Sequence, residues 1–180
     1  MRLRSLLAVL ASLAAAGCAV RPPEPTPSPP PPRPAPTPTP SPSPVVADAR
    51  WIDAPQSAGD WFYRAGGPTT RALFGAAGSE ARFAITCDPA QRRITLARAG
   101  NPAGARQMII RTECGDRALP AVPSAAGAVP AVEAQVSAGD RLLDEMAFSK
   151  GRFAVEVAGL DPLYLPSWPE VTRAIEDCRR

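Results

Sequence analysis

The chain has 180 residues, among them 24 prolines and no histidine, and its formal net charge is +3. Without histidine it cannot build a Ser-His or Cys-His catalytic pair or a histidine-ligated metal site, which excludes most serine hydrolases, cysteine proteases and zinc enzymes. Because 14 of the prolines fall between Pro22 and Pro44, about 135 residues remain, enough for one modest domain with its own core.

The N-terminus has the pattern of a bacterial export signal. Met1-Arg2-Leu3-Arg4 is a short positive region, and residues 6–16 form an apolar run interrupted only by Ser12. A retained transmembrane helix would need roughly 20 apolar residues, whereas this run ends at Gly17-Cys18. We therefore expect residues 1–17 to be a cleaved signal peptide.

The residues at the end of this signal indicate how the chain is processed. Ala15-Ala16-Gly17-Cys18 resembles the lipobox of bacterial lipoproteins, although Ala15 stands where leucine is commonest. The resemblance implies that Cys18 is acylated and anchors the protein in a membrane. Because Ala19 is not aspartate, it further implies the outer membrane, on its periplasmic side. Ordinary cleavage after Ala14-Ala15-Ala16 is the alternative, since it also satisfies the A-x-A rule.

Residues 18–44 are expected to form the lipid anchor and a disordered spacer. Over residues 22–44 proline alternates with small polar residues, and no apolar side chain larger than alanine occurs. Such a segment cannot bury a core, and proline favours an extended polyproline II rod of roughly 70 Å. We expect a tether that holds the domain away from the lipid surface; a passive linker is the alternative.

Residues 45–180 are expected to form a single globular domain. Its 16 basic and 16 acidic residues balance, and the arginines form no basic stripe. A nucleic-acid-binding domain would show such a stripe. We therefore expect no nucleic-acid partner.

Alternating apolar residues predict antiparallel strands. Phe83, Ile85 and Cys87 share one face of a strand that ends at Asp88-Pro89, and residues 93–98 alternate in the same sense, which together predict a hairpin. Further strands are predicted over residues 108–112, 117–122, 132–136 and 153–157, with a brief extended piece over 163–165 and a loop or irregular edge over 120–130.

Two helices are predicted in the second half of the domain. Ser137-Ala138-Gly139-Asp140 is an S-x-x-D helix start, followed by Leu142, Leu143 and Met146 at helical spacing. This short helix should end near Ser149-Lys150-Gly151.

The C-terminal helix has the clearer signals. Ser167-Trp168-Pro169-Glu170 has the form of a capping box with Ser167 as the cap. Val171, Ala174, Ile175 and Cys178 follow at helical spacing and form one apolar stripe. Cys178 should therefore face the core.

Together these elements predict an α+β domain. We expect a mainly antiparallel β-sheet or small sandwich of six or seven strands, with one short central helix and a C-terminal helix. The order of elements resembles that of small β-sandwich envelope proteins such as the invasion-associated family. The resemblance lies in element order alone, so it implies a fold and no activity.

Export from the cytoplasm permits disulfides, and periodicity indicates which cysteines face the core. Cys87 shares the face of Phe83 and Ile85, and Cys178 lies on the helix stripe, so we favour a Cys87–Cys178 bridge. It would close a loop of about 90 residues, worth roughly 4 to 5 kcal/mol in the entropy model. A Cys87–Cys114 bridge is the alternative, although the turn at Gly115 could carry Cys114 outward.

No constellation in the sequence indicates catalysis. Ser149-Lys150 lacks the S-x-x-K spacing of penicillin-binding enzymes. Asp140, Asp144 and Glu145 lie on one short helix, whereas a glycosidase needs two carboxylates across a cleft. We expect these residues to be solvated, and we expect no cofactor, no metal site and no enzymatic activity.

The aromatic group Trp61, Phe62, Tyr63 and Arg64 is the candidate binding site, because these residue types are enriched in binding hot spots. In a strand, Trp61 and Tyr63 would share one face and Phe62 and Arg64 the other, so core packing of one face is the alternative. Trp168, in the first turn of the C-terminal helix, is expected to pack against the sheet.

The leading functional hypothesis is an outer-membrane lipoprotein that acts as a tethered, non-enzymatic periplasmic module and binds an envelope protein or a cell-wall glycan. The alternatives are a carboxylate-dependent cell-wall glycan hydrolase and an inhibitor or assembly accessory. A hydrolase should show a cleft with two convergent carboxyls, one with a raised pKa. A binding module should show an exposed aromatic patch.

Overall fold

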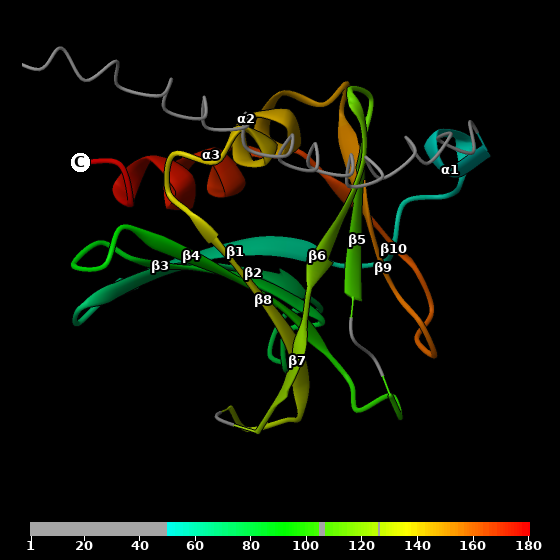
Figure 1. The fold of residues 1–180 in the computed structure, drawn as a ribbon, viewed down its shortest axis with the longest axis horizontal. Coiled ribbons are helices and arrows are strands. Elements are labelled where there is room, and N and C mark those ends of the chain that lie inside the picture. Colours follow the sequence, from blue (N-terminus) through cyan, green and yellow to red (C-terminus); the bar gives the residue numbers. More distant parts are fainter. Residues whose placement is uncertain (1–49, 105–106, 126) are drawn as a thin grey trace, which may run out of the picture. The chain divides into compact units, whose positions relative to one another are not determined.

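The computed structural model describes residues 50–104, 107–125 and 127–180 (Figure 1). The predicted signal peptide, the predicted acylation site Cys18 and the spacer up to residue 44 lie outside the described residues. Within the part of the chain that is described, no helix is both long and apolar enough to cross a bilayer.

The described residues form ten β-strands and three α-helices. The helices are α1 (Arg50–Asp53), α2 (Arg141–Phe148) and α3 (Pro169–Asp177). The strands are β1 (Asp60–Gly66), β2 (Thr69–Gly75), β3 (Phe83–Asp88), β4 (Arg93–Ala99), β5 (Gln107–Thr112), β6 (Gly115–Pro120), β7 (Val122–Ser124), β8 (Ala131–Ser137), β9 (Arg152–Val157) and β10 (Leu163–Pro166). The predicted α+β class is confirmed, but the predicted count of six or seven strands is wrong.

The strands form two antiparallel sheets. The six-stranded sheet has the order β1-β2-β3-β4-β8-β7, and the four-stranded sheet has the order β10-β9-β5-β6. The four-stranded sheet stands steeply across β1 to β4, and α2 and α3 lie on one side of the six-stranded sheet (Figure 1). Helix α3 packs against β1, β2, β3 and α2. The opposite face of the six-stranded sheet carries no helix of the described part.

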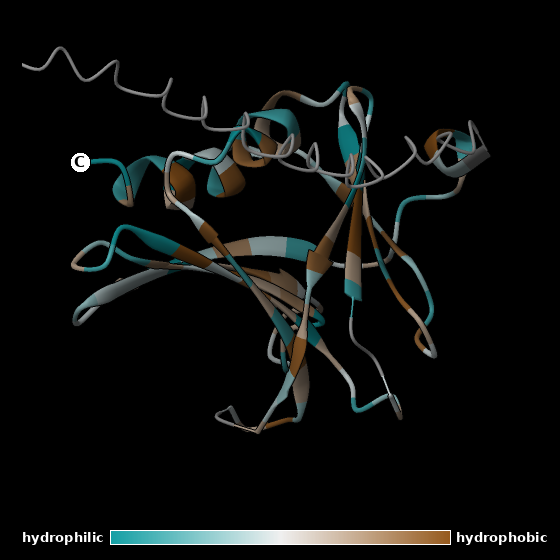
Figure 2. Cartoon of the chain, viewed as in Figure 1, coloured by the Kyte–Doolittle hydropathy of each residue, from teal (hydrophilic) through white to brown (hydrophobic). Residues whose placement is uncertain are grey.

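Local periodicity explains most of these strands. Hydrophobic and hydrophilic residues alternate along many of them (Figure 2), as expected where one face of a sheet is buried. Phe83, Ile85 and Cys87 of β3 are fully buried, and β3 pairs with β4 in the predicted antiparallel hairpin.

Aromatic rings join the two sheets at the centre of the core. The indole ring of Trp61 lies 5.4 Å from the ring of Phe74, 6.3 Å from that of Phe83 and 6.4 Å from that of Phe153. Its Nε1 donates a hydrogen bond to the carbonyl oxygen of Pro166 at 2.8 Å. Trp61 is therefore a core residue, and the expectation that it belongs to an exposed binding patch is wrong.

Helix α1 and the segment after it cover part of the outer face of the four-stranded sheet. Helix α1 packs against β9, and Trp51 is buried. Arg152 donates to the carbonyl oxygen of Ala54 at 2.5 Å, while Ser57 N donates to Tyr164 O and Tyr164 N donates to Ser57 Oγ, both at 3.0 Å. We name residues 54–57 the entry segment. The alternation predicted for β9 fails at Ala154, which is fully buried because α1 covers this side of the strand.

The N-cap of helix α2 lies three residues after the predicted helix start at Ser137. Asp140 is the N-cap, because its carboxylate accepts a hydrogen bond from Leu142 N at 2.9 Å. The expected start at Ser137 is thus wrong. Leu142, Leu143 and Met146 are buried, as their spacing predicts.

The predicted capping role of Ser167 is also wrong. Its hydroxyl donates to the carbonyl oxygen of Met146 at 2.8 Å, so it links α3 to α2 instead of capping α3. The N-cap residue is Trp168, which makes no side-chain cap and is 38% exposed. Trp168 does not pack under the sheet as expected, because its side chain at the N-cap lies off the apolar stripe of the helix.

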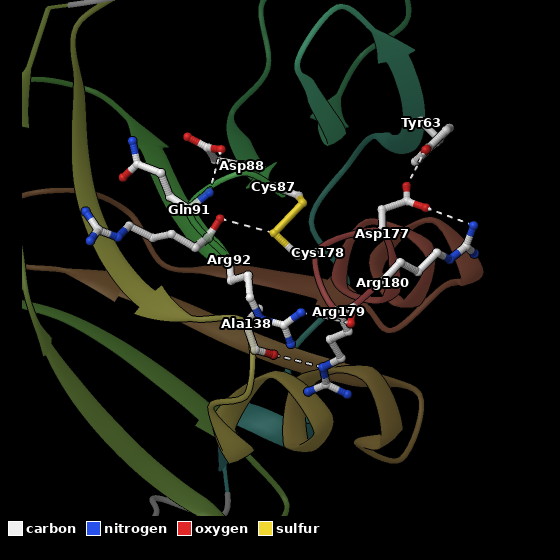
Figure 3. Close-up of a disulfide and its surroundings, with 11 residues drawn as sticks. Tyr63, Cys87, Asp88, Gln91, Arg92, Ala138, Asp177, Cys178, Arg179 and Arg180 are labelled. Carbon is white, nitrogen blue, oxygen red and sulfur yellow. Dashed lines mark hydrogen bonds and ion pairs between the residues drawn. A yellow bond between two sulfur atoms is a disulfide. The ribbon is translucent and has the colours of Figure 1, made fainter.

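The C-terminal end of α3 is fastened to β3 and to the segment before α2 (Figure 3). The structure pairs Cys87 with Cys178, with Cα atoms 5.4 Å apart, which is the pairing that periodicity favours. Arg92 donates to the carbonyl oxygen of Arg179 at 3.2 Å, and Arg179 Nε donates to that of Ala138 at 2.8 Å. Arg179 also pairs with Asp144 on α2 at 2.7 Å, so the end of the chain is held by one covalent bond and several polar contacts.

Cys114 is the unpaired cysteine of the described residues. It is exposed in the turn between β5 and β6. The alternative bridge from Cys87 to Cys114 is not formed, because Gly115 begins β6 directly after Cys114 and the turn carries the thiol outward.

Candidate functional site

The uncovered face of the six-stranded sheet carries a row of aligned side chains. The register places Phe62, Leu73, Ala84, Ala97 and Glu133 side by side on β1, β2, β3, β4 and β8. Nearly all of their neighbours along each strand are buried, and Tyr63, the exception, is half-buried on the side of α3, so these five side chains point outward. We name this set the alanine row.

A second row lies two residues away along each strand. It consists of Arg64, Arg71, Thr86, Thr95 and Gln135, again in register across β1, β2, β3, β4 and β8. All five are exposed or half-buried and point to the same side as the alanine row. We name this set the polar row.

The alanine row is the floor of a groove with a volume of about 510 Å³. The methyl groups of Ala84 and Ala97 leave a depression between Phe62 and Leu73 on one side and Glu133 on the other. Residues 75–81, which lead from β2 toward β3, and residues 127–129 border the groove, and the two arginines of the polar row line it as well. The groove therefore combines an apolar floor with a charged border.

Arg64 and Arg71 are direct cross-strand partners, and both are exposed. Like charges placed opposite each other in an antiparallel pair repel. Arg64 donates to the carbonyl oxygen of Tyr63 at 3.1 Å, and its guanidinium lies 5.8 Å from the centre of the Phe62 ring. Neither arginine forms an ion pair with a carboxylate of the described residues. This end of the groove thus carries two uncompensated positive charges.

The structure divides the predicted binding residues between two faces, as alternation along β1 predicts. Phe62 and Arg64 line the groove, whereas Trp61 and Tyr63 lie on the covered side. The Tyr63 hydroxyl donates to the carboxylate of Asp177 on α3, and this hydrogen bond raises the pKa of Tyr63. The side chain of Tyr63 therefore holds α3 against the sheet.

The sequence reasoning missed the contribution of β2 to the groove. Arg71 and Leu73 line the groove, while Ala72 and Phe74 are buried, so the strand has the same alternation that identified β3. The signal was present in residues 69–75, with Gly66-Gly67-Pro68 as the turn before them. It would have placed Arg71 beside Arg64.

The acidic residues of α2 are all held in ion pairs. The pairs are Asp140–Arg117, Asp144–Arg179 and Glu145–Arg141. Burial alone would raise the pKa of Asp140, but hydrogen bonds from Arg117 and Leu142 N outweigh it and lower the pKa. These carboxylates are charged groups that stabilise the helix, and they do not converge on a cleft.

The pair Ser149-Lys150 has a structural setting as well. The Ser149 side chain is buried and its hydroxyl accepts a hydrogen bond from Glu113 N at 3.3 Å. Lys150 reaches the carboxylate of Glu113 at 3.4 Å. The two residues tie the end of α2 to the turn after β5.

One pair of carboxylates meets on the outer face of the four-stranded sheet. Arg111 on β5 binds Glu156 on β9 at 2.7 Å and Asp116 on β6 at 2.5 Å. Burial raises the pKa of Asp116, whose side chain is only 1% exposed. A hydrolase needs its carboxylates free and within reach of substrate. Here both are bound to the same guanidinium and one is shielded from solvent, so the arrangement is that of a structural ion-pair cluster.

The described residues contain no group of three or more cysteine or acidic side chains placed to hold a metal ion. No protein-family model, no curated protein sequence and no solved structure matches this chain.

Proposed function

We propose that this protein is an outer-membrane lipoprotein that faces the periplasm and binds an envelope partner in the groove of the six-stranded sheet, without catalysing a reaction. The observation that carries the proposal is the uncovered face itself. A solvated sheet face is normally polar, yet Phe62, Leu73, Ala84 and Ala97 stand here in one row. These four side chains are half-buried and remain partly accessible. An accessible apolar strip bordered by charged residues is typical of an interaction site.

The position of the chain's entry into the domain supports this proposal. Helix α1, where the described chain begins, packs against β9 of the four-stranded sheet. The groove lies on the outer face of the other sheet. The described chain therefore enters the domain at the four-stranded sheet, and the groove belongs to the other sheet.

The setting of the acidic residues supports binding over hydrolysis. The carboxylates of Asp140, Asp144 and Glu145 are in ion pairs, and Asp116 and Glu156 share Arg111. The groove is lined by Glu80 and Glu133, from the segment after β2 and from β8.

A photo-crosslinking experiment tests the binding proposal. A photoreactive amino acid replaces Ser79, an exposed residue on the border of the groove, in the full-length protein, expressed in the bacterium that makes it. The control places the same amino acid at Ala118, which is exposed on the four-stranded sheet. We expect a crosslinked product from position 79 and not from position 118. No product from position 79, or the same product from both, would contradict a binding groove.

The mass of the intact protein purified from membranes tests the anchor. We expect an acylated chain that begins at Cys18, with one alkylatable thiol before reduction, that of Cys114, and three after it. A soluble, unacylated chain that begins at Gly17 would mean ordinary signal cleavage and would rule out the lipid anchor.

A further inference from the structure

We propose that Arg64 and Arg71 are the carboxylate-binding end of the groove and that the ligand is an acidic glycan chain. In this arrangement a carboxylate of the glycan pairs with the two guanidinium groups, and its sugar rings lie along the alanine row and the polar row. The inference rests on the proposed function, because it names the ligand class of the same groove.

The two arginines are placed as a receptor for one anion. They sit directly opposite each other on β1 and β2, where side chains are about 5 Å apart at their Cβ atoms. Arg71 has no hydrogen-bond or ion-pair partner among the described residues, and Arg64 has one backbone carbonyl and the ring of Phe62. A carboxylate between them would accept hydrogen bonds from both planar forks and would remove their mutual repulsion.

Other arginines of the described residues differ from this pair. Arg111, Arg117, Arg141 and Arg179 each bind a carboxylate, and the buried Arg98 donates to the carbonyl oxygens of Ala99 and Asp161. Most arginines outside the groove therefore have an acceptor within the domain or, in the case of Arg173, the ring of Tyr63 as a partner. Because no carboxylate of the described residues reaches Arg64 or Arg71, the acid group of a ligand can bind there.

The polar row extends the site beyond a single anion. Next to the arginines it offers the hydroxyls of Thr86 and Thr95 and the amide of Gln135, whose Oε1 already accepts from Arg93 at 3.1 Å. These three uncharged side chains stand on neighbouring strands spaced about 4.8 Å apart, so they span about 10 Å beside the groove. Such a line of donors and acceptors suits the hydroxyl groups of a sugar chain better than a small ion.

The groove fits sugar rings better than a peptide. Extended peptides are usually bound by adding a strand to a sheet edge and by pockets for alternate side chains. This groove crosses the face of the sheet, where the backbone groups of β2, β3 and β4 already pair with their neighbours. Its floor of alanine methyl groups offers a flat surface, and the half-buried ring of Phe62 lies at one end of it. Such a surface can receive the flat face of a sugar.

Calorimetric titration of the full-length protein in detergent tests the proposal. The probes are an oligogalacturonate, which carries a carboxylate on each sugar, a neutral glucan of the same length and a short poly-glutamate peptide. We expect the oligogalacturonate to bind and the other two to bind at least about tenfold more weakly. The neutral glucan lacks the charged hydrogen bonds, which carry about that much affinity, and poly-glutamate lacks the sugar rings that would lie on the groove floor.

Charge-matched variants show whether the two arginines carry the recognition. Arg64→Gln and Arg71→Gln should each weaken oligogalacturonate binding by about tenfold or more. Arg141→Gln is the control, because Arg141 is an exposed arginine on α2, with its side chain 84% exposed, and its loss changes the net charge equally. We expect this variant to bind as the wild type does. Equal losses in all three would indicate nonspecific attraction and would overturn the proposal.

Three further outcomes separate this inference from the proposed function. Ala97→Trp fills the groove and should abolish binding while leaving the unfolding midpoint near that of the wild type; unchanged binding would mean that the ligand does not lie along the alanine row. Tighter binding of poly-glutamate, with the same arginine dependence, would identify an acidic peptide and overturn the glycan. If no probe binds but position 79 still crosslinks in cells, the glycan inference fails and the binding function stands.

Discussion

The arginines on the outer faces of the two sheets differ in whether a carboxylate of the described residues binds them. On the four-stranded sheet, Arg111 is bound by Asp116 and Glu156, and α1 covers the neighbouring strand. On the six-stranded sheet, Arg64 and Arg71 stand together without a described carboxylate. A shielded charge must be paired if the fold is to be stable, whereas an exposed one can remain unpaired until a ligand arrives. The difference fits our proposal, in which the four-stranded face stabilises the fold and the six-stranded face binds a partner.

The largest expected effect concerns the disulfide bond that joins β3 to the end of α3, which belongs to the core and to neither outer face. Replacing both Cys87 and Cys178 by alanine should lower the free energy of unfolding by about 4 kcal/mol, because the bridge closes a long loop between cysteines 91 positions apart. Urea denaturation under identical buffer conditions measures this loss. Cys114→Ser, which changes the exposed unpaired cysteine, is the control and should unfold like the wild type. A double variant as stable as the wild type would mean that the bridge is unimportant for stability.

The next effect compares how much one arginine on each outer face contributes to stability. Arg111→Met removes the partner of a shielded carboxylate and should cost about 2 to 4 kcal/mol of unfolding free energy. The same substitution at Arg71 removes an exposed charge that repels its neighbour and should change stability by no more than about 0.5 kcal/mol. Parallel denaturation curves measure both variants. Equal losses at the two positions would refute the assignment of one face to stability and the other to binding.

The smallest effect is a pH dependence confined to the four-stranded face. Burial holds the pKa of Asp116 above its ordinary value of 3.8. The folded protein therefore keeps this proton to higher pH than the unfolded chain, so Asp116 makes the stability fall as pH rises from about 4 through its raised pKa. Asp116→Asn has no such group.

The test for Asp116 is a comparison of two stability profiles. The stability of the wild type relative to Asp116→Asn should increase as the pH is lowered from neutrality toward 4. Chemical denaturation at a series of pH values gives the difference between the two proteins. A difference that does not change with pH, or that changes in the opposite direction, would show that Asp116 is not desolvated in solution.

Patterns within single elements were sufficient to predict part of this fold. The alternation of Phe83, Ile85 and Cys87 and the helical stripe that ends at Cys178 each depend on residues close together in the sequence. Both cysteines could therefore be assigned to the core, which favoured their pairing. The same local reasoning placed Phe62 and Arg64 on one face of β1.

The groove could not be predicted in the same way, because it depends on register and strand order. Leu73, Ala84 and Glu133 lie in one row only because β2, β3, β4 and β8 follow one another in the sheet. The sequence contains no local pattern for that order. Ser167 shows a different limit. Its local sequence has the form of a capping box, but its hydroxyl donates to the carbonyl oxygen of Met146 on α2.

The contacts of the entry segment have a mechanical consequence. Strand β1 is an edge strand that pairs only with β2 among the described strands, so a pull on its first residue would open that ladder one hydrogen bond at a time. A force arriving along the backbone from before Arg50 reaches Ala54 and Ser57 first, and their bonds to Arg152 and Tyr164 divert it into the four-stranded sheet. Under tension, the bonds of the entry segment would therefore bear the load before the β1–β2 pairing does. Phe62 and Arg64 would then stay in register with β2.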